Sequence, residues 1–170
     1  MTKILSCDLS LTGSAFALLF FDCGELKEVK EVVFVDNKKN TKLGHGARLH
    51  NIAKELEELL ADNPDIDHVV REKGFSRHAQ TTQTLFKVVG VSDLMCHLYK
   101  HDTVHEIAPT TVKKSLTGDG KASKEQVEEA VRLYLPPHQK TLEFQTDDCS
   151  DAVAVGIAFA LEKKFLKKLS

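Results

Sequence analysis

The sequence of 170 residues lacks the features that define several large classes of protein. It has no apolar run long enough to cross a bilayer, and its first residues do not have the basic-then-apolar order of a secretory signal. It also has no tryptophan, no internal repeat and no low-complexity tract. With 42% apolar and 28% charged residues, the composition is typical of a soluble globular protein. We therefore expect a cytoplasmic protein, with no membrane segment, that forms a single domain over residues 1–170.

Paired cysteines and a strong net charge are also missing. The four cysteines are scattered without a C-x-x-C pair, so the sequence contains neither a zinc ribbon nor a thioredoxin-type motif, and we expect reduced thiols. A formal net charge of −2 gives no overall attraction to nucleic acid. Any surface that binds nucleic acid must therefore be a local one.

Hydrophobic periodicity predicts an alternation of strands and helices. The predicted strands are 3–8, 14–21, 28–35, 66–71 and 104–107. The predicted helices are 48–60, 80–98, one that begins at Pro109, one capped by Ser123, and 148–166. A three-stranded meander followed by strand–helix–strand crossovers indicates an α/β fold. We expect a five-stranded mixed sheet, with three antiparallel strands and then parallel strands, and helices on both faces.

Acidic residues lie where such sheets place their sites, beyond the C-terminal ends of parallel strands. Asp8 stands in an apolar strand, where an unpaired carboxylate is costly. Glu72 follows the fourth strand, and Asp148 and Asp151 lie one turn apart on the last helix. Taken singly, Glu72 is most simply a solvated strand end and Asp148 a charge favoured by the helix dipole. Together the four carboxylates indicate a site for divalent cations.

Oxygen ligands without neighbouring histidine or cysteine favour Mg²⁺ or Mn²⁺ over zinc. Two such ions would support in-line attack of water on a phosphodiester, leaving 5′-phosphate and 3′-hydroxyl ends. We therefore expect two Mg²⁺ ions per site, for which Mn²⁺ can substitute. Asp147 is the alternative to Asp148, because it lies four residues before Asp151 and could reach the same face.

The sequence resembles the RuvC-type Holliday junction resolvases of the RNase H-like superfamily over nearly its whole length. Asp8 in CDLSLTG resembles the first-strand aspartate of the family motif D-P-G-x-x-x-T-G, although the chain has Leu-Ser where the motif has Pro-Gly. Glu72 in REKGF resembles the family's strand-four glutamate. The D-x-x-D-A spacing of Asp148 and Asp151 matches the family's helix pair. The resemblance implies an RNase H-like fold in which these four residues hold the metal and carry catalysis.

The stretch APTTVKKSLTGDGKASKEQVEEAV is the most specific part of the resemblance. Lys113 and the helix-opening Lys124 match lysines that, in the family, contact scissile phosphates or the attacking water. An ammonium beside an anionic cluster also suits phosphate capture, and we expect Lys124 to be catalytic. Phe75 matches the aromatic residue that stacks on unpaired bases at the crossover. The predicted DNA-binding residues are Lys113, Lys114, Lys121, Phe75 and Arg77.

These residues predict a structure-selective endonuclease that resolves four-way (Holliday) DNA junctions by paired, symmetric cuts. A junction has approximate two-fold symmetry, so the resemblance implies a homodimer. Apolar residues after Gln80 either form its interface or simply pack on the sheet: Leu85, Val88, Val89 and Leu94. Two alternatives are a branched-DNA-binding module with weak or no cleavage, and a nuclease that cuts other branched or flapped DNA, since branch geometry is read by shape.

Overall fold

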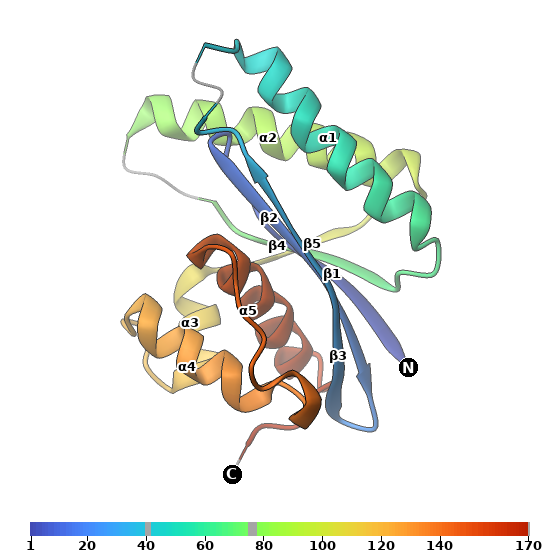
Figure 1. Cartoon of the computed structure of the whole chain (residues 1–170), viewed down its shortest axis with the longest axis vertical. Helices are drawn as coiled ribbons and strands as arrows, with labels where there is room; N and C mark the ends of the chain where they lie inside the picture. Colours follow the sequence, from blue (N-terminus) through green and yellow to red (C-terminus); the bar gives the residue numbers. More distant parts are fainter. Residues whose placement is uncertain (40–41, 75–77, 170) are drawn as a thin grey trace.

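The computed structural model describes residues 1–39, 42–74 and 78–169 and contains a five-stranded mixed sheet (Figure 1). In sheet order the strands are β3 (Glu25–Asp36), β2 (Gly13–Asp22), β1 (Thr2–Asp8), β4 (His68–Glu72) and β5 (Val104–Ile107). The first three are antiparallel, whereas β4 runs parallel to β1 and β5 runs parallel to β4. The predicted fold class is therefore confirmed.

Helices cover both faces of the sheet (Figure 1). One face carries α1 (His45–Asp62) and α2 (Ala79–Leu98). The other carries α3 (Pro109–Thr117), α4 (Lys124–Tyr134) and α5 (Asp147–Glu162), with a short 3₁₀ turn at Pro137–Gln139. Of these, α5 packs directly on β1 and β2, and α3 and α4 pack on α5.

The alternation of side chains along β1 decides which residues face α5. Ile4 belongs to the core beneath α5, and Leu5 to the core beneath α1 and α2. Because successive side chains of a strand point to opposite faces, Asp8 shares the α5 face with Ile4. On that face the Ser6 hydroxyl donates a hydrogen bond of 2.7 Å to the Ala152 carbonyl oxygen. This buried contact fixes α5 against the strand that ends at Asp8.

The start of α4 is as predicted, whereas the end of α5 is not. Ser123 Oγ accepts a hydrogen bond from the backbone N–H of Gln126, and the Gln126 side chain accepts one from the Ser123 N–H, which is a capping box. The last helix, predicted to reach residue 166, ends at Glu162. Lys164 adopts a left-handed φ of 63°, and the Phe165 N–H donates back to the Ala160 carbonyl oxygen at 2.8 Å. The left-handed residue after a helix is usually glycine. Because a lysine occupies this position, no residue type in the sequence marks the end of α5.

Most of the apolar side chains predicted as a dimer interface on α2 point inward. Three of them pack in the core between α2, α1 and the sheet: Leu85, Val88 and Val89. Leu94 differs, because it is 56% exposed on the outer side of the helix. The structure therefore favours simple packing on the sheet for three of the four residues.

Cys7, Cys96 and Cys149 are buried and Cys23 is exposed, and all four are free thiols. In the ranges that the structure describes, no helix has the length and apolar character needed to span a membrane.

Candidate active site

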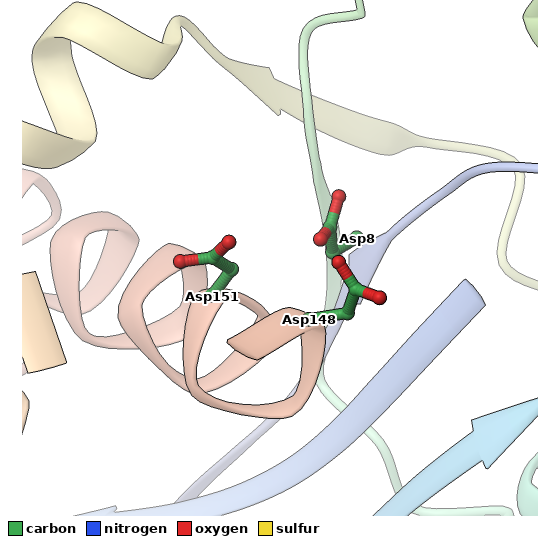
Figure 2. A group of neighbouring side chains, drawn as sticks. All are labelled: Asp8, Asp148 and Asp151. Atoms are coloured by element: carbon green, nitrogen blue, oxygen red, sulfur yellow. The ribbon is translucent and has the colours of Figure 1, made fainter. Parts of the chain in front are cut away.

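Three aspartates from β1 and α5 meet at the C-terminal edge of the sheet (Figure 2). Asp8, Asp148 and Asp151 each contribute a carboxylate oxygen, and these atoms all lie within 4.8 Å of one another. Asp8 is the last residue of β1, and the two helix aspartates are three residues apart, so both face the strand end. The group therefore combines one carboxylate on a strand with two on the first turns of a helix packed against that strand.

Glu72 reaches the same region from β4. The parallel register pairs Cys7 with Arg71, so the next residues, Asp8 and Glu72, leave neighbouring strands side by side. Both line a cavity of about 470 Å³, and Glu72 shares a second cavity of about 140 Å³ with Asp151. Glu72 does not belong to the group whose oxygens lie within 4.8 Å of one another. It borders that group on the β4 side.

Burial and neighbouring negative charges raise the pKa of Asp8, Glu72 and Asp151. Burial, followed by the charges of Glu72 and the two α5 aspartates, raises the pKa of Asp8 to about 7. Burial and then the charge of Asp151 raise the pKa of Glu72 to about 7. The pKa of Asp151 is also raised, mainly by burial. A bound cation would offset this repulsion and favour the ionised form of these acids.

Lys124 contacts the cluster from the first position of α4. Its Nζ lies 3.0 Å from Asp151 Oδ2. Burial acts to lower the pKa of Lys124, but the hydrogen bond to Asp151 and the other α5 carboxylates outweigh it, and the pKa is raised. The ammonium therefore stays charged. The capping box at Ser123 fixes the start of α4 and with it the position of this lysine.

Lys113 approaches the acidic site from α3. Its positive charge opposes the rise in the pKa of Glu72, which places the two groups within electrostatic reach of each other. Lys113 and Lys124 also line the cavity of about 140 Å³ that Glu72 borders. The two lysines singled out by the motif are thus brought to the carboxylates.

The other predicted DNA-binding residues are placed differently. Lys114 is exposed on α3, and Lys121 is exposed in the loop between α3 and α4. The backbone N–H of Lys121 donates to Asp119 Oδ1 at 2.9 Å, which holds the loop in shape. Phe75 and Arg77 lie outside the described residues.

The structure distinguishes Asp148 from Asp147. Asp148 belongs to the carboxylate group, whereas the Asp147 side chain is exposed and its backbone carbonyl accepts a 2.9 Å hydrogen bond from the Ser150 hydroxyl. Gly13, at the start of β2, lies beside Asp148: a Cβ on this glycine would be in ordinary contact with Asp148 Oδ2 at 3.4 Å and in tight contact with the Phe34 ring at 3.0 Å. The beginning of α5 therefore lies directly against the β1–β2 turn.

Sequence reasoning misses the uncharged residues that line the larger cavity. They come from the loop after Asp8 and from the first turns of α2: Ser10, Thr12, Gln80, Thr81 and Thr84. Hydroxyl and amide residues in such places have no distinctive pattern. The signal that could have found them is their nearness in sequence to Asp8 and Glu72.

The fold and the acidic group define a class of protein, a nuclease of the RNase H-like fold. The family described as "Crossover junction endodeoxyribonuclease RuvC" matches residues 4–159. The RuvC of Prochlorococcus marinus is 34% identical over 148 residues, which cover 86% of this chain and 83% of that protein. The RuvC of Gluconobacter oxydans is 31% identical over 161 residues, covering 94% and 90%.

A solved structure agrees in fold. The chain described as "T. thermophilus RuvC in complex with Holliday junction substrate" aligns with a TM-score of 0.83 at 18% identity and covers 96% of each chain. The protein belongs to the RuvC family of crossover junction endodeoxyribonucleases. The resemblance predicted from the motifs is thereby confirmed.

Proposed function

We propose that this protein resolves four-way (Holliday) DNA junctions by metal-dependent hydrolysis of phosphodiester bonds. The observation that carries the proposal is the convergence of Asp8, Asp148 and Asp151 at a strand end of a RuvC-family chain. The acidic group accounts for hydrolysis, and the family accounts for the substrate, since its relatives are crossover junction endodeoxyribonucleases. We propose that residues 1–170 act as a single nuclease domain and that, with DNA as its substrate, the protein works in the cytoplasm.

Asp8, Glu72, Asp148 and Asp151 would hold two Mg²⁺ ions, for which Mn²⁺ could substitute. The donor set fits these ions, because it offers only oxygen atoms and because the pKa of Asp8 and that of Glu72 are raised to about 7 by burial and neighbouring charge. When bound, the cations supply Lewis acidity to the phosphodiester and to the attacking water. The protein contributes rigid placement of the ligands on two strand ends and one helix.

The lysines supply charge of the opposite sign. We propose that Lys124, which contacts Asp151 at 3.0 Å, turns to the scissile phosphate when DNA binds and stabilises the charge that develops there. Lys113, beside Glu72, offers a second ammonium for the same phosphate or its neighbour. Lys114 and Lys121, which are exposed, would contact the DNA backbone further out. From the family resemblance, Phe75 would stack on an unpaired base and Arg77 would contact the DNA.

We further propose a two-fold homodimer through the outer face of α2. Three large apolar side chains are exposed on this face, at spacings of eight and four residues: Phe86 (61%), Leu94 (56%) and Leu98 (62%). Gly90 lies between them and leaves open space beside the backbone. A second copy is the occupant that suits a two-fold substrate, because it places two identical sites on opposing strands.

The oligomeric state tests this interface directly. We expect the wild type to sediment as a dimer and Leu94→Glu to sediment as a monomer at the same micromolar concentration. Leu133→Glu is the matched control, because Leu133 is equally large and 66% exposed on α4. A monomeric wild type, or the same loss in both variants, would count against α2 as the interface.

Cleavage of synthetic DNA tests the function. The purified protein and two variants, Asp151→Asn and Asp147→Asn, are incubated with a labelled four-way junction, a flap and a linear duplex of matched sequence, with Mg²⁺ or with chelator. We expect paired, symmetric nicks in the junction alone, with 5′-phosphate ends. The chelator and Asp151→Asn should abolish them, and Asp147→Asn should retain them because its side chain is outside the acidic group.

The alternatives correspond to other outcomes of the same assay. Binding of the junction without nicks by the wild type would indicate a branched-DNA-binding module. Equal attack on flap and junction would indicate a nuclease for branched DNA in general.

A further inference from the structure

The loop that follows Asp8 is closed by serine hydroxyl groups. Ser10 Oγ accepts hydrogen bonds from the N–H groups of Thr12 and Gly13, both at 3.2 Å. The Ser14 hydroxyl donates to the Ser10 carbonyl oxygen at 2.8 Å and accepts from the Ser10 N–H at 3.1 Å. These contacts hold the four-residue connection between Asp8 and β2 in one compact shape.

Asn37, the first residue after β3, joins this loop to α1. Its backbone N–H donates to the Thr12 carbonyl oxygen at 3.1 Å. Its side-chain Nδ2 donates to two further carbonyl oxygens, those of Leu11 at 3.2 Å and Arg48 at 3.1 Å. Its Oδ1 accepts from Asn51 Nδ2 at 3.0 Å. A fully buried amide thus uses both of its N–H donors and its oxygen to connect the loop with the helix.

We propose that Asn37 is a positioning residue for Asp8. A buried polar group that is fully hydrogen-bonded fixes the elements it joins, because any displacement leaves donors or acceptors unpaired. Here the elements are α1 and the loop that begins at the residue after Asp8, and a cation ligand must be held to within about 0.5 Å. Asn37 therefore acts through the loop on the orientation of the Asp8 carboxylate. The inference rests on the proposed cation site.

The test separates positioning from overall stability by comparing substitutions within one network. Asn37→Asp keeps the size of the side chain and an oxygen for Asn51, but it sets an oxygen against the carbonyl oxygens of Leu11 and Arg48. Asn51→Ala removes the hydrogen bond that Asn37 Oδ1 accepts and leaves the other hydrogen bonds of Asn37 in place. Leu56→Ala is the matched control, because Leu56 is buried in α1 and its loss lowers stability without removing a hydrogen bond of Asn37.

Two readouts are made on the DNA-free protein at a temperature where circular dichroism shows each variant to be folded. The first is the affinity for Mn²⁺, from the electron paramagnetic resonance signal of the free ion. The second is hydrogen–deuterium exchange of the peptide that contains residues 9–14. We expect Asn37→Asp to lower the Mn²⁺ affinity by about 10-fold or more and to speed exchange in the loop. Asn51→Ala should have a smaller effect in both, and Leu56→Ala should leave the affinity within about twofold of the wild type.

Two results would overturn the positioning role: wild-type Mn²⁺ affinity in Asn37→Asp, or an equal loss in Leu56→Ala. Asp8→Asn is titrated alongside to separate this failure from failure of the proposed function. If Asp8→Asn binds Mn²⁺ like the wild type, the cation site itself is refuted, and the role of Asn37 falls with it. If Asp8→Asn loses the ion and Asn37→Asp does not, only the positioning role is refuted.

Discussion

Arg71 and Glu72 are neighbours in sequence, yet they enter opposite faces of β4 and meet opposite electrostatic surroundings. Beneath α2, the Arg71 guanidinium contacts Asp93 and lies 3.0 Å from Glu106. Beneath α5, Glu72 borders a group of three aspartates in which Asp151 contacts Lys124. In the first cluster both carboxylates pair with the guanidinium. In the second, within the part of the chain that the structure describes, Asp151 forms an ion pair with a lysine, whereas Asp8, Glu72 and Asp148 do not.

This difference in charge pairing indicates which of the two clusters is suited to bind a cation. Burial acts to lower the pKa of Arg71, but its two carboxylate partners outweigh burial and raise it, so that cluster is stable in its charged form. On the other face the pKa of Asp8 and that of Glu72 rise to about 7, because burial and like charges oppose ionisation. Carboxyl groups whose pKa is raised in this way are typical of functional sites. Substitutions on the two faces should therefore affect different properties of the protein.

The largest effect is expected from Asp8→Asn. We expect it to abolish junction cleavage while junction binding is retained, because the amide cannot supply the anionic ligand. Without metal, its free energy of unfolding should not fall, since one repulsive charge is gone. Cleavage and thermal melting in chelator measure the two properties. Glu106→Gln, on the Arg71 face, should instead keep cleavage and lower the free energy of unfolding. Cleavage by Asp8→Asn would refute the assignment of Asp8 to the active site.

Next in size is the effect of Lys124→Met, which removes the ammonium at the acidic cluster. We expect the single-turnover cleavage rate at saturating junction to fall by about 10²-fold, as when a group that stabilises developing charge is lost. Lys168→Met, an exposed lysine near the C-terminus, serves as the control and should cut at the wild-type rate. Equal rates for Lys124→Met and the control would mean that Lys124 only fixes Asp151.

On the paired face, Arg71→Met should lower stability and spare the chemistry. We expect a loss of about 2 kcal/mol in urea unfolding, because two carboxylates lose their partner, while their exposure of 49% and 40% limits the cost through solvent screening. Cleavage per folded molecule should stay within about twofold. A large loss of cleavage at full stability would show that the Arg71 cluster also serves the active site.

The strand and helix positions of the acidic residues could be predicted because periodicity fixes them. Asp8 shares its face with Ile4 through the two-residue repeat of a strand, and Asp148 and Asp151 share a face through the helical repeat. These predictions needed only local geometry and the order of the strands.

The contacts that depend on packing between distant elements could not be predicted. The partners of Arg71 come from β5 and α2, and the partners of Asn37 come from α1 and the β1–β2 loop, so both sets depend on register and helix placement. The inward orientation of Val88 and the outward orientation of Leu94 likewise depend on the rotation of α2. The end of α5 was missed because Lys164 takes a conformation that its residue type does not favour.

The smallest effect, and the sharpest test of the unpaired acidic groups, is the dependence of stability on pH without metal. Asp8 and Glu72 have a pKa of about 7 in the folded protein and ordinary values near 4 when unfolded, so the folded state binds more protons between these limits. Their contribution to stability is therefore present at low pH and is lost as the pH rises through 7.

In chelator, we expect the free energy of unfolding of the wild type to rise between pH 8 and pH 5, by at least about 1 kcal/mol more than that of Asp8→Asn. Saturating Mg²⁺ should flatten this difference, because the cation replaces the protons as the compensating charge. Denaturant unfolding at pH 8 and at pH 5 measures the free energy of unfolding of both proteins. Equal pH dependence in the wild type and Asp8→Asn would mean that the pKa of Asp8 is not raised in the folded protein. The charge of Asp8 would then be compensated, as the charges around Arg71 are.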